Sequence, residues 1–464
     1  YTIRCQFNFF SMHFTYAGII SLCVLFLIIV HVKGKIQTLV TLPLAMICVN
    51  FYNFYGRYGN VEFSLRSEML LLFSFLMFLI SYSIGTRLVI RKSVSFINDI
   101  IHKENSNGDL LCKRSVFSFF IFIVFLYACF DLWLNTWLYG SFEAAMTRFY
   151  VRQTIDEAPS FLVNMQVFIM TTIISLIFVF RLFQNIYHKR TALIYIPIAI
   201  LILISFPKGS RGATVSPILF LILADLFYVK FYSVKQLAFY SKRMFEYCSL
   251  IIVSCFLFFI LTFIRGIELD DIADLYEHLS SFELSQGTEE YGESEKDLML
   301  SDLQFTFDNY GSKISFLPVT YTLGTVLCNP IPRAIFPKKP IGFGTVLTEA
   351  KYGNNDYSVE NLVKWRTSFA VGVAGEGWAN GGLLGLFLYS VLMGVYSGYF
   401  SKLYFRFILS QNYLSVIIAL LFFQCSGKFI RGDLLSGITQ GIYPIILFII
   451  IVQLVYRKKK IVHN

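Results

Sequence analysis

Long runs of apolar residues alternate with short polar segments along most of the chain. About eleven of these runs come close to the ~20 residues that cross a ~30 Å hydrocarbon core, and each predicts a membrane-spanning helix. The runs lie near residues 14–32, 36–55, 68–90, 116–139, 161–181, 191–206, 213–229, 247–264, 381–401, 412–427 and 434–456. The pattern therefore predicts an all-α, polytopic integral membrane protein.

Composition supports this interpretation. Of the 464 residues, 56% are hydrophobic and 15% are charged, and the mean hydropathy is +0.63. A water-soluble body of this length needs more polar surface than that. The chain is therefore expected to lie within a lipid bilayer.

One long hydrophilic segment, residues 265–367, interrupts the apolar pattern. It divides the chain into a transmembrane bundle of about eight helices (1–264), a large loop (265–367) and C-terminal transmembrane helices with a basic tail (368–464). The loop is acidic in its first half and basic in its second. Between the halves, residues 316–340 are apolar but too short to span, and their prolines interrupt helices. We expect an interfacial or re-entrant element there.

Lysine and arginine in the short loops orient the predicted helices. The basic loops lie near residues 33–35, 87–114, 181–190, 230–243 and 402–406, with the tail at 457–460, and they alternate with the spans. Such loops face the cytoplasm, so the hydrophilic segment is expected to face the exterior or periplasm. The net charge of +10 then partly reflects topology, and no nucleic-acid partner is implied.

A set of arginines remains on the opposite, outer face. Its members are Arg57, Arg148, Arg152, Arg211, Arg265, Arg333, Arg366 and Arg431. Arginine presents a planar fork that suits phosphate and carboxylate oxygens. The set predicts a binding site for a phosphorylated lipid or an anionic glycan; the alternative for each arginine is snorkelling or pairing with a nearby acid.

Four short patterns place charge beside glycine or proline at the edges of spans. They are PKGSRG (Pro207–Gly212), IPRAIFPKKP (Ile331–Pro340), VAGEGWANGGLLG (Val373–Gly385) and GKFIRGD (Gly427–Asp433). At such positions the chain leaves helix geometry and can expose backbone amides. The second pattern also brings Lys338 and Lys339 to headgroup depth.

Taken in this order, with one large external loop late in the chain, these patterns resemble the O-antigen polymerase family of Wzy-type enzymes. The resemblance implies a membrane-embedded, GT-C-like glycosyltransferase that joins undecaprenyl-diphosphate-linked oligosaccharide repeat units and releases undecaprenyl diphosphate. It implies that Arg211, Arg265, Arg333 and Arg431 hold the diphosphates and that Glu376 belongs to the site. A chain-length regulator protein is a further implied partner. Arg148, Lys338, Lys339 and Arg366 join the substrate-binding set through their outer-face positions.

The chemistry can also be argued from the residues. Glycosyl transfer from a polyprenyl diphosphate requires stabilisation of the departing diphosphate and removal of a hydroxyl proton. Glu376 and Asp433 are the outer-face carboxylates nearest to span ends, so either is a candidate general base. The alternative for Glu376 is an anchoring ion pair with Arg366 or Arg333, and for Asp433 a pair with Arg431.

No cofactor and no metal are expected. Asp270, Asp271 and Asp274 have the spacing of a magnesium motif, but acids are common in the first turn of a helix. The related O-antigen ligases use an external histidine, for which His278 is the candidate here; the alternative is an exposed loop residue.

Two other functions remain open. A flippase or transporter for the same lipid-linked glycans would need a long amphiphilic cavity and often shows internal repeats, but the chain shows neither a convincing half-to-half repeat nor charged residues at mid-span in both halves. A ligase-type glycosyltransferase with a polyprenyl donor is the second alternative. The long external segment favours an enzyme.

Overall fold

The structure is a computed structural model that describes the greater part of the chain. It covers residues 48, 64–88, 114–142, 145, 160–187, 192–206, 208, 211–231, 244–264, 301–329, 331, 335–336, 338–353, 358, 370–409, 413–431, 434–447 and 449–450. Every regular element in these ranges is a helix, apart from one isolated bridge between Tyr310 and Ile314. The all-α prediction is therefore confirmed for the described residues.

The helices coincide with the apolar runs. Among the described residues, five helices are long and apolar enough to cross a membrane: Leu65–Leu88, Ser115–Tyr139, Met165–Ile186, Met244–Leu261 and Gly382–Leu403. Shorter apolar helices cover Ala192–Ser205, Ala213–Leu226 and Leu420–Ile430. The chain is a membrane protein by these helices; the spans predicted near 14–32 and 36–55 lie outside the described residues, Cys48 excepted.

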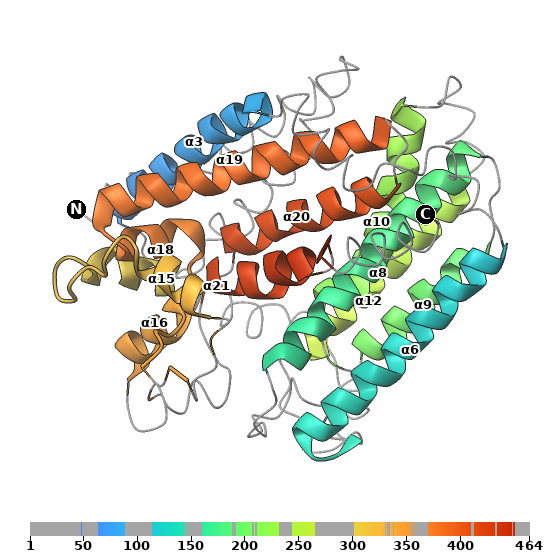
Figure 1. The fold of residues 1–464 in the computed structure, drawn as a ribbon, viewed down its shortest axis with the longest axis horizontal. Coiled ribbons are helices and arrows are strands. Elements are labelled where there is room, and N and C mark those ends of the chain that lie inside the picture. The colour runs from blue at the N-terminus through green and yellow to red at the C-terminus, as the bar shows by residue number, and fades with distance from the viewer. Residues whose placement is uncertain are drawn as a thin grey trace, which may run out of the picture. The chain divides into compact units, whose positions relative to one another are not determined.

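Contacts group the chain into two compact units (Figure 1). The first comprises Tyr1–His102, Glu295–Ser410 and Ile418–Asn464, and the second comprises Lys103–Ser294 and Gln411–Ile417. The first unit contains α3 (Leu65–Leu88), α15 (Tyr321–Cys328), α16 (Phe343–Tyr352), α18 (Gly372–Ala379), α19 (Gly382–Leu409), most of α20 (Tyr413–Arg431), α21 (Leu434–Gly437) and the π-helix η2 (Ile438–Ile442). The second contains α6 (Arg114–Tyr139), α8 (Ser160–Ile186), η1 (Ala192–Ile194), α9 (Tyr195–Ser205), α10 (Arg211–Phe231) and α12 (Met244–Ile264).

In the first unit, α3 and α19 lie side by side (Figure 1). A Cβ on Gly394 would come within 2.5 Å of the Phe78 carbonyl oxygen, and one on Gly398 within 2.0 Å of the Tyr82 carbonyl oxygen. The backbones are therefore as close as small residues allow, which is how transmembrane helices gain packing contacts. Beside this seam, the Tyr82 hydroxyl lies 2.6 Å from the Ser401 hydroxyl.

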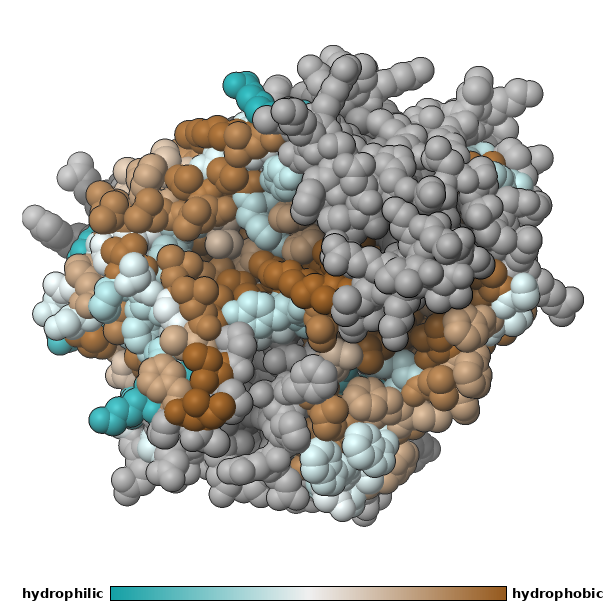
Figure 2. All heavy atoms as spheres, viewed as in Figure 1, coloured by the Kyte–Doolittle hydropathy of each residue, from teal (hydrophilic) through white to brown (hydrophobic). Residues whose placement is uncertain are grey.

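In the second unit, α6, α8, α9 and α10 share an apolar core. It includes Phe117, Phe120 and Phe180, and the rings of Phe117 and Phe180 meet edge to face with centroids 5.3 Å apart. Large apolar side chains also point outward from the helices of both units, and Figure 2 shows hydrophobic residues over much of the visible surface. An outward apolar face is what lipid contact requires.

Part of the hydrophilic segment is folded. Residues 301–309 are helical, and α15 and α16 follow. The prolines limit helix length as expected, because α15 forms between Pro318 and Pro330 and ends at Cys328. These helices are too short to span, and together with α18 they lie at one end of α19 (Figure 1).

Candidate functional site

Helix α18 carries the GEGW sequence, and all eight of its residues are buried. It is followed by Gly381 and Gly382, whose φ angles of 110° and 65° favour glycine and allow the sharp turn into α19. Gly375 lies against Val371 and Leu303, where a Cβ would meet their side chains at 2.5 and 3.0 Å. The glycines therefore let the chain pack on both sides of Glu376.

Glu376 joins three parts of the chain. Its Oε1 accepts a hydrogen bond of 2.7 Å from the Thr322 hydroxyl of α15. Its Oε2 accepts one of 2.8 Å from the backbone N–H of Leu434, the first residue of α21. Asn380 supports the pair by donating to the Thr322 hydroxyl at 3.2 Å and to the Glu376 carbonyl at 2.7 Å. Glu376 itself is 2% exposed.

The bond between Glu376 and the Leu434 N–H brings the VAGEGWANGGLLG pattern close to the end of the GKFIRGD pattern. Arg431 ends α20 three residues before Leu434, and three residues of extended chain cover at most about 10 Å. The backbone of Arg431 therefore lies within about 10 Å of the residue that contacts Glu376. The side chain of Arg431, and Asp433 altogether, lie outside the described residues.

The geometry bears on what Glu376 does. Both carboxylate oxygens accept hydrogen bonds, and the side chain is inaccessible, so in this state Glu376 acts as an anchor between α15, α18 and α21. A general base must reach the proton that it removes. The base role stays a prediction, and it requires the carboxylate to exchange one of these partners for substrate.

The two lysines of the IPRAIFPKKP pattern differ in their surroundings. Lys339 donates to the carbonyls of Asn329 and Ile331, at 2.7 and 3.1 Å, just beyond the C-terminus of α15. A cation is favourable there because the last carbonyls of a helix are unpaired and the helix dipole is negative. Lys338 is exposed. Of the two, Lys338 is the residue whose ammonium group remains available to a ligand.

A second buried carboxylate lies in the hydrophilic segment. Asp302 is 1% exposed, and its Oδ1 accepts from Lys351 at 2.7 Å and from the Tyr352 hydroxyl at 3.1 Å. Burial raises the pKa of the Asp302 carboxyl above its ordinary value, while the Lys351 ammonium opposes that shift. This cluster ties α16 to the helical residues 301–309.

The second unit has a buried polar cluster around Asp131 in the C-terminal half of α6. Asp131 accepts from the Lys208 ammonium, which follows α9, and from the Gln166 amide of α8 at 2.5 Å. Trp133 and Trp137 stack on the exposed face of α6 beside it, with centroids 5.8 Å apart. Exposed tryptophans are typical of the membrane–water interface. Lys208 belongs to the PKGSRG pattern, whose Arg211 begins α10.

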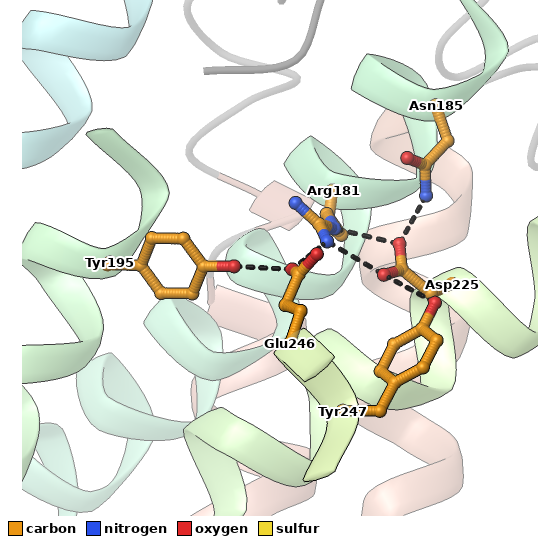
Figure 3. A network of polar contacts seen from close by, with 6 residues as sticks. All are labelled: Arg181, Asn185, Tyr195, Asp225, Glu246 and Tyr247. Carbon is orange, nitrogen blue, oxygen red and sulfur yellow. Dashed lines mark hydrogen bonds and ion pairs between the residues drawn. The ribbon is translucent and has the colours of Figure 1, made fainter. Parts of the chain in front are cut away.

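A larger network, near the C-terminus of α8, links α8, α9, α10 and α12 (Figure 3). The Arg181 guanidinium binds Asp225 through two bonds of 2.7 Å and Glu246 through one of 2.6 Å. The Asn185 amide and the Tyr247 hydroxyl also donate to Asp225, at 2.5 and 3.1 Å, and the Tyr195 hydroxyl donates to Glu246. The fork of Arg181 thus holds α8, α10 and α12 together.

The sequence interpretation did not single out Asp131, Asp225 or Glu246, and it assigned Arg181 to a basic loop, whereas the structure buries Arg181 within α8. Asp131, Asp225 and Glu246 stand within or beside apolar runs, and such intramembrane ionisable residues are the signal that could have found them. Of the predicted site residues, Arg148, Arg265, Arg333, Arg366 and Asp433 lie outside the described residues, as do His278 and the Asp270–Asp274 stretch, and the side chain of Arg211 does too. Among the described residues, no group of three or more His, Cys, Asp or Glu side chains is arranged to hold a metal ion.

Comparison of the chain with protein-family models, with characterised proteins and with solved structures gives no match. The function must therefore be argued from the site.

Proposed function

We propose that this chain is a polysaccharide polymerase of the O-antigen type. It would join undecaprenyl-diphosphate-linked oligosaccharide repeat units at the outer face of a bacterial cytoplasmic membrane, releasing undecaprenyl diphosphate. The observation that carries the proposal is the bond between Glu376 and the Leu434 N–H, because it brings the VAGEGWANGGLLG pattern against the residue that follows the GKFIRGD pattern, while Thr322 of the folded hydrophilic segment bonds to the same carboxylate. A protein that only crosses the membrane does not need such a folded hydrophilic segment.

The direction of the helices requires an odd number of crossings between α3 and α19, as the proposed topology of about eleven spans has. Along α3 and α19 the contacts advance together, with Ser74 beside Ser390, Phe78 beside Gly394 and Tyr82 beside Gly398. The two helices are therefore parallel. In the proposed topology five spans separate them, and an odd number of intervening crossings gives parallel helices.

In the proposed reaction, arginines bind and stabilise the diphosphate groups. Arg211, Arg265, Arg333 and Arg431 would bind the diphosphate oxygens of the lipid carriers, where the guanidinium fork stabilises the charge that develops as the glycosidic bond breaks. Lys338 would add a further cation close to the headgroups. A carboxylate, Glu376 or Asp433, would accept the proton of the attacking sugar hydroxyl.

Purified protein incubated with lipid-linked repeat units tests the proposal. Chain extension, seen as a ladder of lipid-linked products, is the expected result. Replacing Arg211 or Arg431 by alanine should abolish the ladder with the protein still inserted, whereas lysine should restore it only in part because it lacks the bidentate fork. Absence of any ladder from wild-type protein would rule out polymerase activity.

A flippase for the same lipids is the second candidate. The observation that favours it is the pair of buried charged clusters at opposite ends of the second unit, around Asp131 and around Arg181, since ionisable residues within a membrane often line transport paths. Translocation of lipid-linked repeat units across vesicle membranes without extension would identify a flippase. Transfer of a finished chain to a different lipid acceptor would instead identify a ligase.

A further inference from the structure

Arg66 is an exposed arginine in the first turn of α3, and its guanidinium lies over the ring of Trp378, with Cζ 5.3 Å from the ring centroid. Among the described residues, no carboxylate pairs with it. A cation–π contact engages the charge of a guanidinium and leaves its five N–H donors free for another partner. Arg66 is thus oriented without being neutralised.

Trp378 is a fixed platform for this arginine. It lies two residues after Glu376 on α18 and is 6% exposed. Phe307 and Phe316 pack against it edge to face, with centroid distances of 6.1 and 5.6 Å, so the ring is held in place. Its buried Nε1–H has no acceptor among the described residues, which is an uncommon arrangement for an indole.

The start of α3 also belongs to the candidate site. The Ser64 N–H, just before the helix, donates to Gln304 Oε1 at 3.3 Å, which ties this end of α3 to the folded hydrophilic segment. Asp308, one turn further along that segment, accepts from the Gln304 amide. Arg66 therefore stands where α3, α18 and the hydrophilic segment meet.

We propose that Arg66, held on the ring of Trp378, binds the diphosphate group of the lipid-linked substrate. The inference deepens the proposed polymerase function and rests on it. Arg66 would contact phosphate oxygens directly, and Trp378 would be a positioning residue that restricts the guanidinium. A charge-assisted, bidentate contact of this kind contributes about 10- to 100-fold in affinity.

The test measures binding to purified protein in nanodiscs of neutral lipid. Two probes are titrated separately, undecaprenyl diphosphate and inorganic pyrophosphate, for wild type and for Arg66→Ala, Arg66→Lys and Trp378→Phe. Arg87→Ala serves as a control because Arg87 is exposed at the other end of α3, and Lys313→Ala because Lys313 is exposed within the hydrophilic segment. Thermal unfolding of each variant confirms that it is folded.

Arg66→Ala should weaken the binding of both probes about 10-fold or more, and Arg66→Lys should weaken it less. The two controls should change the affinity by less than about 2-fold. The Arg66→Ala/Trp378→Phe double variant should bind no more weakly than Arg66→Ala, because the platform acts only through the arginine. Unchanged binding by Arg66→Ala would overturn the inference, as would a loss confined to the lipid probe or a wild type that binds neither probe. Arg66-dependent binding without chain extension by wild type would support this site and reject the polymerase.

Discussion

Lys208 and Asp131 form an ion pair inside the second unit, joining the segment after α9 to α6. Each side chain is 5% exposed, and the Gln166 amide occupies the other oxygen of the carboxylate. Lys208 stands three residues before Arg211, which begins α10. The pair therefore fixes the turn that carries a predicted diphosphate-binding arginine.

Breaking this pair on one side should destabilise the protein. Asp131→Asn leaves the Lys208 ammonium buried without a countercharge, which we expect to lower the free energy of unfolding by about 3 kcal/mol. The Asp131→Asn/Lys208→Met double variant should recover much of that loss because no isolated charge remains. Thermal or denaturant unfolding in detergent measures all three proteins. Equal losses in the single and double variants would mean that the ion pair is not the stabilising element.

The seam between α3 and α19 gives a second prediction. Gly398→Ala forces a Cβ to within 2.0 Å of the Tyr82 carbonyl oxygen, so the helices must separate and the yield and thermal stability of folded protein should fall. Gly427 is a matched control, since it lies in the long helix α20 with nothing within 4 Å of a Cβ. Gly427→Ala should leave thermal stability unchanged or slightly raised. If both substitutions are tolerated alike, the close approach is not required.

The sequence predicted the long helices well because each depends only on its own residues. The apolar run at 116–139 is long enough to span whatever its neighbours, and α6 covers Arg114–Tyr139. The run at 191–206 was less clear because it is short, and it becomes η1 followed by α9. Close packing at Gly394 and Gly398 was not predicted, and their spacing does not by itself identify α3 as the partner.

The contacts within the candidate site could not be predicted from the sequence. The pattern around Glu376 marked a span edge, but its bonds come from Thr322 and Leu434, each more than fifty positions away. Arg66 lies at the edge of an apolar run, where its contact with Trp378 cannot be recognised locally. Contacts that depend on three segments meeting have no local signature.

The proposed topology predicts which side each loop faces. A cysteine in place of Lys338, which is exposed on the hydrophilic segment, should react with a membrane-impermeant thiol reagent in intact cells, whereas one in place of Arg87 should react only after permeabilisation. Native cysteines that react must first be replaced by alanine. The reverse pattern of labelling would place the candidate site in the cytoplasm and exclude a polymerase that works on the outer face.

Two tyrosines of the hydrophilic segment provide a matched pair. The Tyr310 hydroxyl is buried without a partner among the described residues, while the Tyr321 hydroxyl donates to the Ile341 carbonyl at 3.1 Å. Tyr310→Phe should raise the free energy of unfolding by about 1 kcal/mol, and Tyr321→Phe should lower it by about 1 kcal/mol. Equal effects from the two substitutions would show that the Tyr310 hydroxyl has a partner in solution.

The buried Tyr310 also predicts that the stability of the fold depends on pH in the alkaline range. Burial raises the pKa of Tyr310 from 10.0 to about 12. Between these values the unfolded chain loses the phenolic proton while the folded chain keeps it, so the free energy of unfolding falls as the pH rises from 10 towards 12. Melting temperatures of wild type and Tyr310→Phe between pH 9 and about 11.5 should show a smaller alkaline decline in the variant. Parallel curves would contradict the shift.

The last prediction separates Glu376 as an anchor from Glu376 as a base. In Glu376→Gln one oxygen can still accept from Thr322, but the new amide nitrogen faces the Leu434 N–H and cannot accept from it. An anchor should therefore lose about 1–3 kcal/mol of stability, and extension should fall only as far as the fold loosens. A base should lose about 10²- to 10⁴-fold in rate while the folded protein still binds lipid-linked substrate.

Thr322→Val is the control, because it removes the other partner of Glu376 and leaves the carboxylate able to take a proton. We expect Glu376→Gln and Thr322→Val each to reduce stability by a similar amount and each to reduce the rate of chain extension only modestly. A large rate loss in Glu376→Gln alone, with unchanged stability, would assign the proton transfer to Glu376 and reject the anchor.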